Sequence, residues 1–435
     1  MGRRRRSPAK TARRKGDHMT AAVRGALPRI DGIGVGVVPL LALAIFIQYV
    51  DRGNLATAAP LMKDQLHLST IQIGVLLSAF YWTYTPAQIL SGWLAERINA
   101  YRTLALGLGL WSVSTIGSGL VSGFGALIFL RLLLGLGESA AFPCSSKLIG
   151  QHLPPHKLGA ANGLIGMGLA LGPAFGTFFG GMLMAQVGWR PVFVIFGVAS
   201  LLWLWPWLTA TRHHSAAANA SVTEPAPSYF AILGRREAWG TGLGHFANNY
   251  AFYFVISWLP LYLVKSRGFT VPQMAEIGGL VYVVYAMSSV ATGWLCDRWM
   301  LAGASFNKAR KTAAVASHVL VAASMMACAV GDARVALVSL FLAGIAFGFN
   351  TPTIYSIGQV LAGPRAAGKW IGLQNCAGNV AGIVAPVLTA LVVDRTGQFT
   401  WAFVIAGGVG LTGVVWWALV IPKIAPLDWT PAAAR

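Results

Sequence analysis

The sequence contains few charged residues for its length. Asp, Glu, Lys and Arg make up 11% of its 435 residues, whereas hydrophobic residues make up 56%. Soluble globular proteins carry about 25% charged residues, so this chain cannot cover a surface that faces water. The composition therefore excludes a soluble enzyme and a disordered scaffold.

Acidic residues are especially scarce, at 13 against 33 Lys and Arg, which gives a formal net charge of +20. An excess of basic residues often indicates nucleic-acid binding. Here, however, the basic residues lie between apolar segments and do not gather in one soluble domain. We therefore expect no nucleic-acid partner and read the basic residues as signals for orientation in a membrane.

Cysteine is scarce as well, and the patterns of enzyme chemistry are missing. The 4 cysteines are scattered without CxxC or Cys/His spacing, and the 8 histidines form no HExxH motif. The sequence thus predicts no disulfide framework, no metal, no cofactor and no enzyme. A membrane sensor would carry a sizeable soluble signalling domain, whereas the longest loop expected here is about 26 residues. We therefore do not expect a membrane sensor.

What the sequence has in abundance is long apolar segments, each near the roughly 20 residues that a membrane-spanning helix needs. The twelve segments are 33–56, 71–95, 102–122, 125–150, 157–184, 189–211, 239–264, 273–296, 312–331, 335–360, 369–393 and 399–422. We therefore predict an all-α integral membrane protein with twelve transmembrane helices.

Two segments interrupt this pattern. Residues 1–30 hold ten Lys and Arg but lack the apolar core of a secretory signal, which predicts a disordered basic tail. Met19 is an alternative start to Met1. Ala, Ser and Pro enrich a stretch within 212–237, which predicts a linker between two six-helix bundles. The bundles would span 31–211 and 238–423, followed by a tail over 424–435.

The distribution of Lys and Arg predicts the orientation. Outside the basic tail, fifteen of them fall on the side of the termini and the linker, and six on the opposite side. Positive residues favour the cytoplasmic side, so both termini and the linker should be cytoplasmic. The Ala- and Arg-rich composition is typical of a bacterium with GC-rich DNA. We therefore expect a multi-pass protein of the bacterial inner membrane.

The two halves repeat each other. The segment Gly92–Arg97 recurs as Gly293–Arg298, 201 positions later, and three residues of the fifth predicted helix recur in the eleventh at an offset of 213. The latter are Gly159, Asn162 and Pro173, matched by Gly372, Asn375 and Pro386. Six-helix repeats around a site at the middle of the membrane are a transporter architecture.

These motifs resemble those of the major facilitator superfamily. The segment Gly92–Arg102 is similar to its signature loop, with Glu96 at the usual Asp. Segment 49–55, Tyr-Val-Asp-Arg-Gly-Asn-Leu, and segment 131–143 resemble the anion:cation symporter family. The resemblance implies transport of an organic anion with protons, and it assigns conformational gating to the loop and its repeat. The gating residues would be Gly92, Glu96, Arg97, Arg102, Gly293, Asp297 and Arg298.

Four ionisable residues fall well within predicted spans: Asp51, Arg52, Arg131 and Glu138. Each costs about 2.5–3.5 kcal/mol on insertion scales, so it should be paired or functional. One interpretation is an Asp51–Arg131 ion pair that only holds helices together. The other gives the residues separate roles. Arg52 or Arg131 would clamp a carboxylate with its forked donors, and Glu138, with Asp51 as second candidate, would carry the proton.

Polar and aromatic residues on other helices complete the predicted substrate site. Tyr49 and Tyr355 are candidates by position, and the resemblance implies substrate contacts for Tyr84 and Asn375. We interpret His245 as a packed histidine more readily than as a proton relay. Sugar-acid members of the family have Gln where this chain has Leu169, which favours an aromatic or short-chain acid over a polyhydroxylated one.

The sequence therefore predicts a monomeric transporter that imports a small organic anion, either a sugar acid or an aromatic or short-chain carboxylate. Protons would be the coupling ion, and the two halves would rock about the central site in alternating access. The alternative is an efflux transporter of the same superfamily for a drug or metabolite, because fixed arginines indicate an anion but do not set the direction.

Overall fold

The computed structural model describes residues 33–220 and 226–429, which form long helices parallel to one axis. The first half contains α2 (Ile33–Gln65), α3 (Thr70–Leu94), the π-helix η1 (Ala95–Asn99), α4 (Ala100–Leu120), α5 (Phe124–Glu138), α6 (Ala141–His152), η2 (Pro155–Lys157), α7 (Leu158–Phe175), η3 (Gly176–Gly180), α8 (Gly181–Val187), α9 (Trp189–Leu202) and α10 (Leu204–Ala220). The second half contains α11 (Tyr229–Leu233), α12 (Arg236–Leu261), η4 (Tyr262–Ser266), α13 (Val271–Leu301), α14 (Phe306–Val330), α15 (Ala333–Ala362), α16 (Ala367–Thr396), α17 (Thr400–Val415) and η5 (Trp416–Val420).

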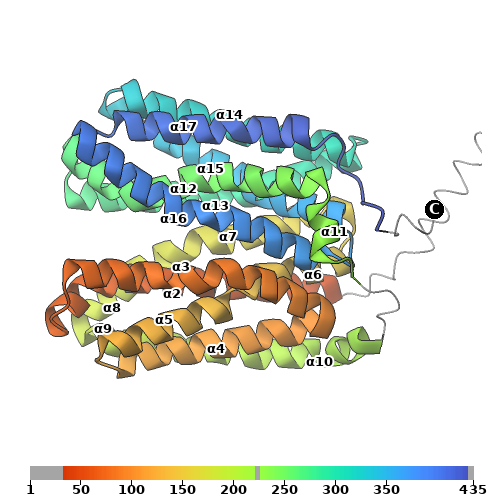
Figure 1. Cartoon of the computed structure of the whole chain (residues 1–435), viewed down its shortest axis with the longest axis horizontal. Coiled ribbons are helices and arrows are strands. Elements are labelled where there is room, and N and C mark those ends of the chain that lie inside the picture. The colour runs from red at the N-terminus through yellow and green to blue at the C-terminus, as the bar shows by residue number, and fades with distance from the viewer. Residues whose placement is uncertain (1–32, 221–225, 430–435) are drawn as a thin grey trace, which may run out of the picture.

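The two halves lie side by side as separate bundles, with the red-to-yellow half below the green-to-blue half in Figure 1. α7 runs between them and packs against α2 of its own half and α13 of the other. The end of α10, the short helix α11 and the described segment that follows η5 all lie at one end of the long axis, which we call the linker end. The predicted class of twelve helices in two bundles is confirmed.

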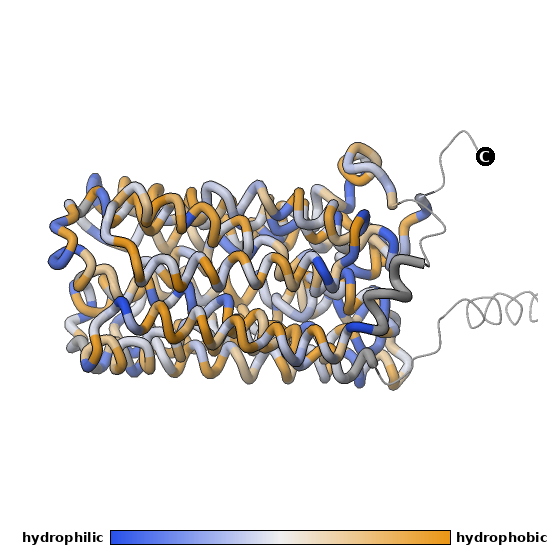
Figure 2. The backbone as a smooth tube through the Cα atoms, turned by 90° about the horizontal axis from the view of Figure 1, so that it is seen from below, coloured by the Kyte–Doolittle hydropathy of each residue, from blue (hydrophilic) through white to orange (hydrophobic). Residues whose placement is uncertain are grey.

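Apolar residues run along the length of these helices, and hydrophilic segments gather mainly at the two ends of the long axis (Figure 2). Within the described residues, 10 helices are long and apolar enough to cross a membrane. Because η1 joins α3 to α4, the stretch Ile71–Leu120 counts as one of them. α12 is not among them, and it carries His245, Asn248 and Asn249 in its middle.

The fourth predicted span is broken in the structure. α5 ends at Glu138, and α6 starts at Ala141 after a turn at Ser139 and Ala140. Pro143 explains the break, because a proline has no N–H to donate and its ring crowds the carbonyl four residues earlier. The Ser139 hydroxyl donates to the Leu136 carbonyl at 2.7 Å and satisfies one of the freed acceptors. The break leaves Glu138 at the last turn of α5.

Glycines allow α7 to approach its neighbours closely. A Cβ atom on Gly163 would lie 2.8 Å from the Ser289 carbonyl oxygen of α13. On the other side of α7, a Cβ atom on Gly172 would lie 2.7 Å from the Phe46 carbonyl oxygen of α2. No side chain larger than hydrogen fits at either contact, so Gly163 lets α7 lie close to the other half and Gly172 lets it lie close to α2 of its own half.

The predicted linker and tails can be compared with the helix ends in the structure. α10 continues through Arg212 to Ala220, into the predicted linker, in line with the high helix propensity of its alanines. The predicted tail over 1–30 lies outside the described residues, as do positions 430–435. The described part of the C-terminal tail packs on the second half: the Leu427 N–H donates to the Leu361 carbonyl at 3.0 Å, and the Trp429 indole donates to Ala362 at 2.9 Å.

Candidate functional site

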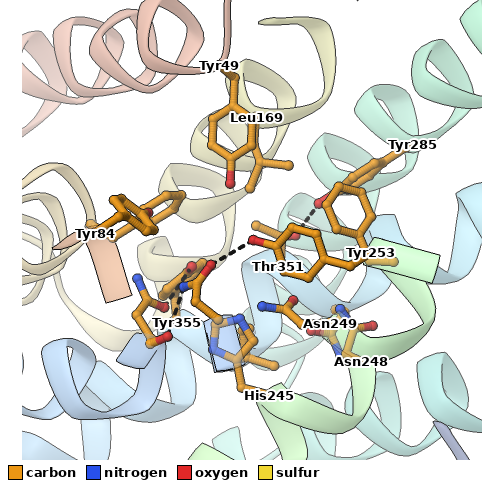
Figure 3. A pocket seen from close by; sticks show the side chains of 16 residues that line it. Tyr49, Tyr84, Leu169, His245, Asn248, Asn249, Tyr253, Tyr285, Thr351 and Tyr355 are labelled. Carbon is orange, nitrogen blue, oxygen red and sulfur yellow. Dashed lines mark hydrogen bonds between the residues drawn. The ribbon is translucent and has the colours of Figure 1, made fainter. Parts of the chain in front are cut away.

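A cavity of about 440 Å³ lies between the two halves. Its 16 lining residues come from α2, α3, α6 and α7 of the first half and from α12, α13, α15 and α16 of the second. Figure 3 shows Tyr49 and Leu169 on one side and His245, Asn248 and Asn249 on the other. A position between the two halves is where a transporter would hold its substrate.

Four of the six predicted substrate-binding residues line this cavity: Tyr49, Tyr84, Tyr355 and Asn375. The Tyr355 hydroxyl donates to Asn375 Oδ1 at 3.1 Å, which fixes both side chains. The ring of Phe142, which the sequence analysis missed, stacks on Tyr355 with 5.2 Å between ring centroids. Because Phe142 and Tyr355 come from different halves, this stack also joins the two bundles across the cavity.

The two predicted arginines are not part of the lining. Arg52 lies directly behind the first-half wall, with its guanidinium carbon 4.4 Å from the ring centroids of both Tyr49 and Tyr84 and 4.7 Å from that of Phe80. Its Nε donates to Glu138 Oε2 at 3.1 Å, and the two side chains are 11% and 0% exposed. Three aromatic rings and one carboxylate therefore hold this cation next to the cavity.

The Arg52–Glu138 pair differs from the Asp51–Arg131 pair considered from the sequence. Among the described residues, Asp51 and Arg131 take part in no ion pair within 4.0 Å. Asp51 accepts from the Thr115 hydroxyl of α4 at 3.5 Å, and Arg131 lies 5.4 Å from the Phe80 ring. Both side chains are buried. As expected from their adjacent positions on one helix, Asp51 and Arg52 point toward different neighbours.

At the linker end, the predicted gating loop joins the two halves. The Glu96 carboxylate accepts from the Lys147 ammonium and from the Gly368 N–H at 2.8 Å. Gly368 is in the first turn of α16, where free N–H groups favour a negative charge. Gly92 lies against the backbone of Gly368 and Lys369, so a larger side chain there would push α3 away from α16.

The repeat of this loop makes the equivalent contact between α13 and α7. Asp297 accepts from the N–H groups of Gly159 at 3.2 Å and Ala160 at 2.7 Å, in the first turn of α7, and it also pairs with Arg310. Gly293 lies against the Gly159 backbone. The two carboxylates thus bind equivalent helix starts in opposite halves at the linker end.

The three arginines predicted to act with these carboxylates are exposed and form no ion pair with them among the described residues. The guanidinium of Arg97 lies 5.2 Å from the Trp93 ring and that of Arg298 lies 5.1 Å from the Trp294 ring, and both side chains are exposed. Arg102 is exposed at the start of α4. The sequence analysis did not assign Lys147 and Arg310, the cations that pair with Glu96 and Asp297.

His245 is a cavity residue that the sequence interpretation placed in simple packing. Its ring lies edge-on to Tyr355, with 5.9 Å between centroids, and the side chain is 4% exposed. The signal that could have revealed it is the run of polar residues in the middle of a predicted span. Among the described residues, no group of three or more His, Cys, Asp or Glu could hold a metal ion.

Comparison with known proteins decides the family. The model of the Major Facilitator Superfamily matches residues 41–386 and 309–435. The chain belongs to the Major Facilitator Superfamily. A hexuronate transporter of Bacillus subtilis is 30% identical over 416 residues, which cover 92% of this chain and 96% of that protein. A probable sulfoacetate transporter of Cupriavidus necator is 29% identical and covers 86% of this chain and 91% of its own.

The superfamily fold is also seen in solved structures. The proton:xylose symporter XylE, bound to a bromodeoxyglucose, matches with a TM-score of 0.69 over 90% of this chain and 96% of its own, at 15% identity. Its membership of the superfamily makes the present chain a multi-pass membrane transporter and not an enzyme.

Proposed function

We propose that this transporter imports a small organic anion together with protons across the inner membrane of a bacterium, with both termini cytoplasmic. The observation that carries the proposal is the buried Arg52–Glu138 pair directly behind the aromatic wall of the cavity. A fixed cation beside a cavity suits an anion, and a carboxylate beside that cation can exchange a proton for its ionic partner. Two of the similar proteins are named as transporters of organic anions, hexuronate and sulfoacetate, which supports the same substrate class.

Proton binding and substrate binding are coupled through Arg52. While Glu138 is charged, the Arg52 guanidinium donates its Nε–H to it and has a partner of opposite sign. Protonation of Glu138 removes that negative charge and leaves the guanidinium free to bind a substrate carboxylate. The rings of Tyr49 and Tyr84 keep the guanidinium next to the cavity, and Arg131 adds a second positive charge nearby.

Alternating access then uses the two gating contacts. The structure corresponds to a state closed at the linker end, which in the proposed orientation is the cytoplasmic end. Neutralising both Glu138 and the substrate charge lowers the cost of moving the halves, and the linker end opens when Glu96 and Asp297 leave the helix starts of α16 and α7. Release of the proton inside restores the Arg52–Glu138 pair and expels the anion.

The proposal is tested in proteoliposomes that contain a pH-sensitive dye. D-glucuronate, sulfoacetate or benzoate is added outside, with choline as a cationic control and empty liposomes as a second control. We expect at least one of the anions to acidify the interior, because each anion brings a proton with it, and choline to have no effect. If labelled anions enter without any acidification, proton coupling is wrong. If none of the anions enters, the substrate class is wrong.

A further inference from the structure

The second-half wall of the cavity contains polar side chains without hydrogen-bond partners. Asn350 of α15 is 0% exposed, and neither its Nδ2 nor its Oδ1 has a partner among the described residues. The same holds for Nδ1 of His245, Oδ1 of Asn248 and Nδ2 of Asn375, whose side chains are at most 7% exposed. Buried polar groups are normally hydrogen-bonded, so this cluster calls for a ligand that supplies several bonds.

The first-half wall is different. Its four lining residues are Tyr49, Tyr84, Phe142 and Leu169, so it contributes two hydroxyl groups and otherwise apolar surface. The cation Arg52 lies behind the two tyrosines. The cavity therefore has two chemically distinct sides: an aromatic side backed by a positive charge, and a side with amide and imidazole groups whose lining includes no Asp, Glu, Lys or Arg.

The unpartnered atoms also indicate which groups the ligand carries on the amide side. Asn350 offers both a donor and an acceptor, whichever way its amide is turned, and the Asn248 oxygen is a further acceptor. A carboxylate can only accept, so it cannot satisfy amide oxygens. A hydroxyl group both donates and accepts, and several hydroxyls on one carbon skeleton can satisfy both kinds of atom.

The His245 ring is held in a defined orientation. Its ring packs against α16 at Gly378, where a Cβ atom would lie 2.8 Å from the imidazole Cγ and Nδ1. The ring is also edge-on to Tyr355, whose own hydroxyl is occupied by Asn375. The imidazole is therefore fixed between two elements while its Nδ1 keeps no partner among the described residues.

We propose that His245, Asn248 and Asn350 form a hydroxyl-binding subsite, so that the transporter selects a polyhydroxylated carboxylic acid over an aromatic or aliphatic one. The substrate carboxylate lies toward Tyr49, Tyr84 and Arg52, and its hydroxyl-bearing carbons lie against α12 and α15. This inference rests on the proposed function. It replaces the expectation, drawn from Leu169, of an aromatic or short-chain acid.

The test compares two acids of the same ring size with and without hydroxyls, D-glucuronate and cyclohexanecarboxylate. Their affinities for the purified transporter are measured by ligand-dependent thermal stabilisation in detergent. We expect D-glucuronate to bind at least about tenfold more tightly, the effect of one or more net hydrogen bonds. Equal affinities, tighter binding of cyclohexanecarboxylate, or no binding of either acid would overturn the subsite, while anion-driven acidification in proteoliposomes would still support the proposed function.

Two variants test which side chains are responsible for the preference for D-glucuronate over cyclohexanecarboxylate. Asn350→Leu keeps the approximate volume without the amide, and His245→Phe keeps a ring without nitrogen atoms. Each should reduce D-glucuronate affinity about tenfold and leave cyclohexanecarboxylate affinity within about twofold. The matched control is Ser324→Ala on α14, which likewise removes a buried polar group without a partner among the described residues but lies outside the cavity lining. If both variants keep the preference of the parent protein, these side chains do not bind the hydroxyls.

Discussion

The most direct test of the coupling mechanism is Glu138→Gln. Glutamine keeps the shape of the side chain and a carbonyl oxygen that can accept from Arg52 Nε, but it can neither bind nor release a proton. It therefore imitates the protonated state permanently. In the proposed mechanism this state binds the anion and changes conformation, so the variant should exchange substrate across the membrane but fail to concentrate it.

The structural cost of the substitution follows from the site. Removing one partner of a fully buried ion pair costs about 3–5 kcal/mol, and Glu138 is 0% exposed. The amide still accepts one hydrogen bond, and three rings at 4.4–4.7 Å still contact the guanidinium. We therefore expect a loss of about 1–3 kcal/mol in unfolding free energy, which leaves the protein folded in the membrane.

The functional effect is larger and can be measured directly. A gradient of one pH unit provides about 1.4 kcal/mol for each coupled proton, which accumulates a substrate about tenfold. In proteoliposomes with labelled D-glucuronate, the parent protein should reach this ratio, whereas the variant should stay near onefold and retain exchange. Asp51→Asn serves as comparison for the second buried acid. Glu138→Gln that still accumulates substrate as well as the parent protein would refute the assignment of the coupling proton to Glu138.

Three further predictions address the clamp, the gate and the orientation. Arg52→Lys should lower uptake at least about tenfold, because an ammonium cannot stack on three rings or offer a forked donor; near-normal uptake would exclude a guanidinium clamp. Gly293→Ala should abolish most transport by pushing α13 from the Gly159 backbone, whereas Gly279→Ala on the same helix, where a Cβ atom meets nothing within 4 Å, should transport normally; equal activities would contradict the gate. A reporter fused after Pro227 should be cytoplasmic and one after Lys265 periplasmic, and the opposite labelling would reverse the proposed orientation.

The positions of the helices were largely predictable from the sequence, because a bilayer selects apolar runs of nearly constant length. Their ends were less predictable. The span predicted over 312–331 corresponds to α14, Phe306–Val330, whose first turn is polar. The Ser305 side chain accepts from the Lys308 N–H and starts this helix before its apolar part. Hydropathy thus locates the membrane-embedded part of a helix, while capping chemistry sets where the helix begins.

The candidate site was only partly predictable. The sequence identifies four buried charges, but the pairing of Arg52 with Glu138 depends on how α2 and α5 are rotated about their axes, which no spacing within one helix determines. Asp297 and Arg310 contact each other across a loop, so their contact was missed for the same reason. The polar wall of the cavity required α12 to face α15 and α16, an arrangement set by packing between distant segments.

The polarity of α12 also bears on how the chain is made. Most of the other long helices are long and apolar enough to cross a membrane, but α12 is not among the described helices that meet that criterion. Its amide and imidazole groups are costly in hydrocarbon until neighbouring helices cover them. α12 packs chiefly against α16, which is synthesised more than a hundred residues later. We therefore expect α12 to reach its final burial only after α16 has been synthesised.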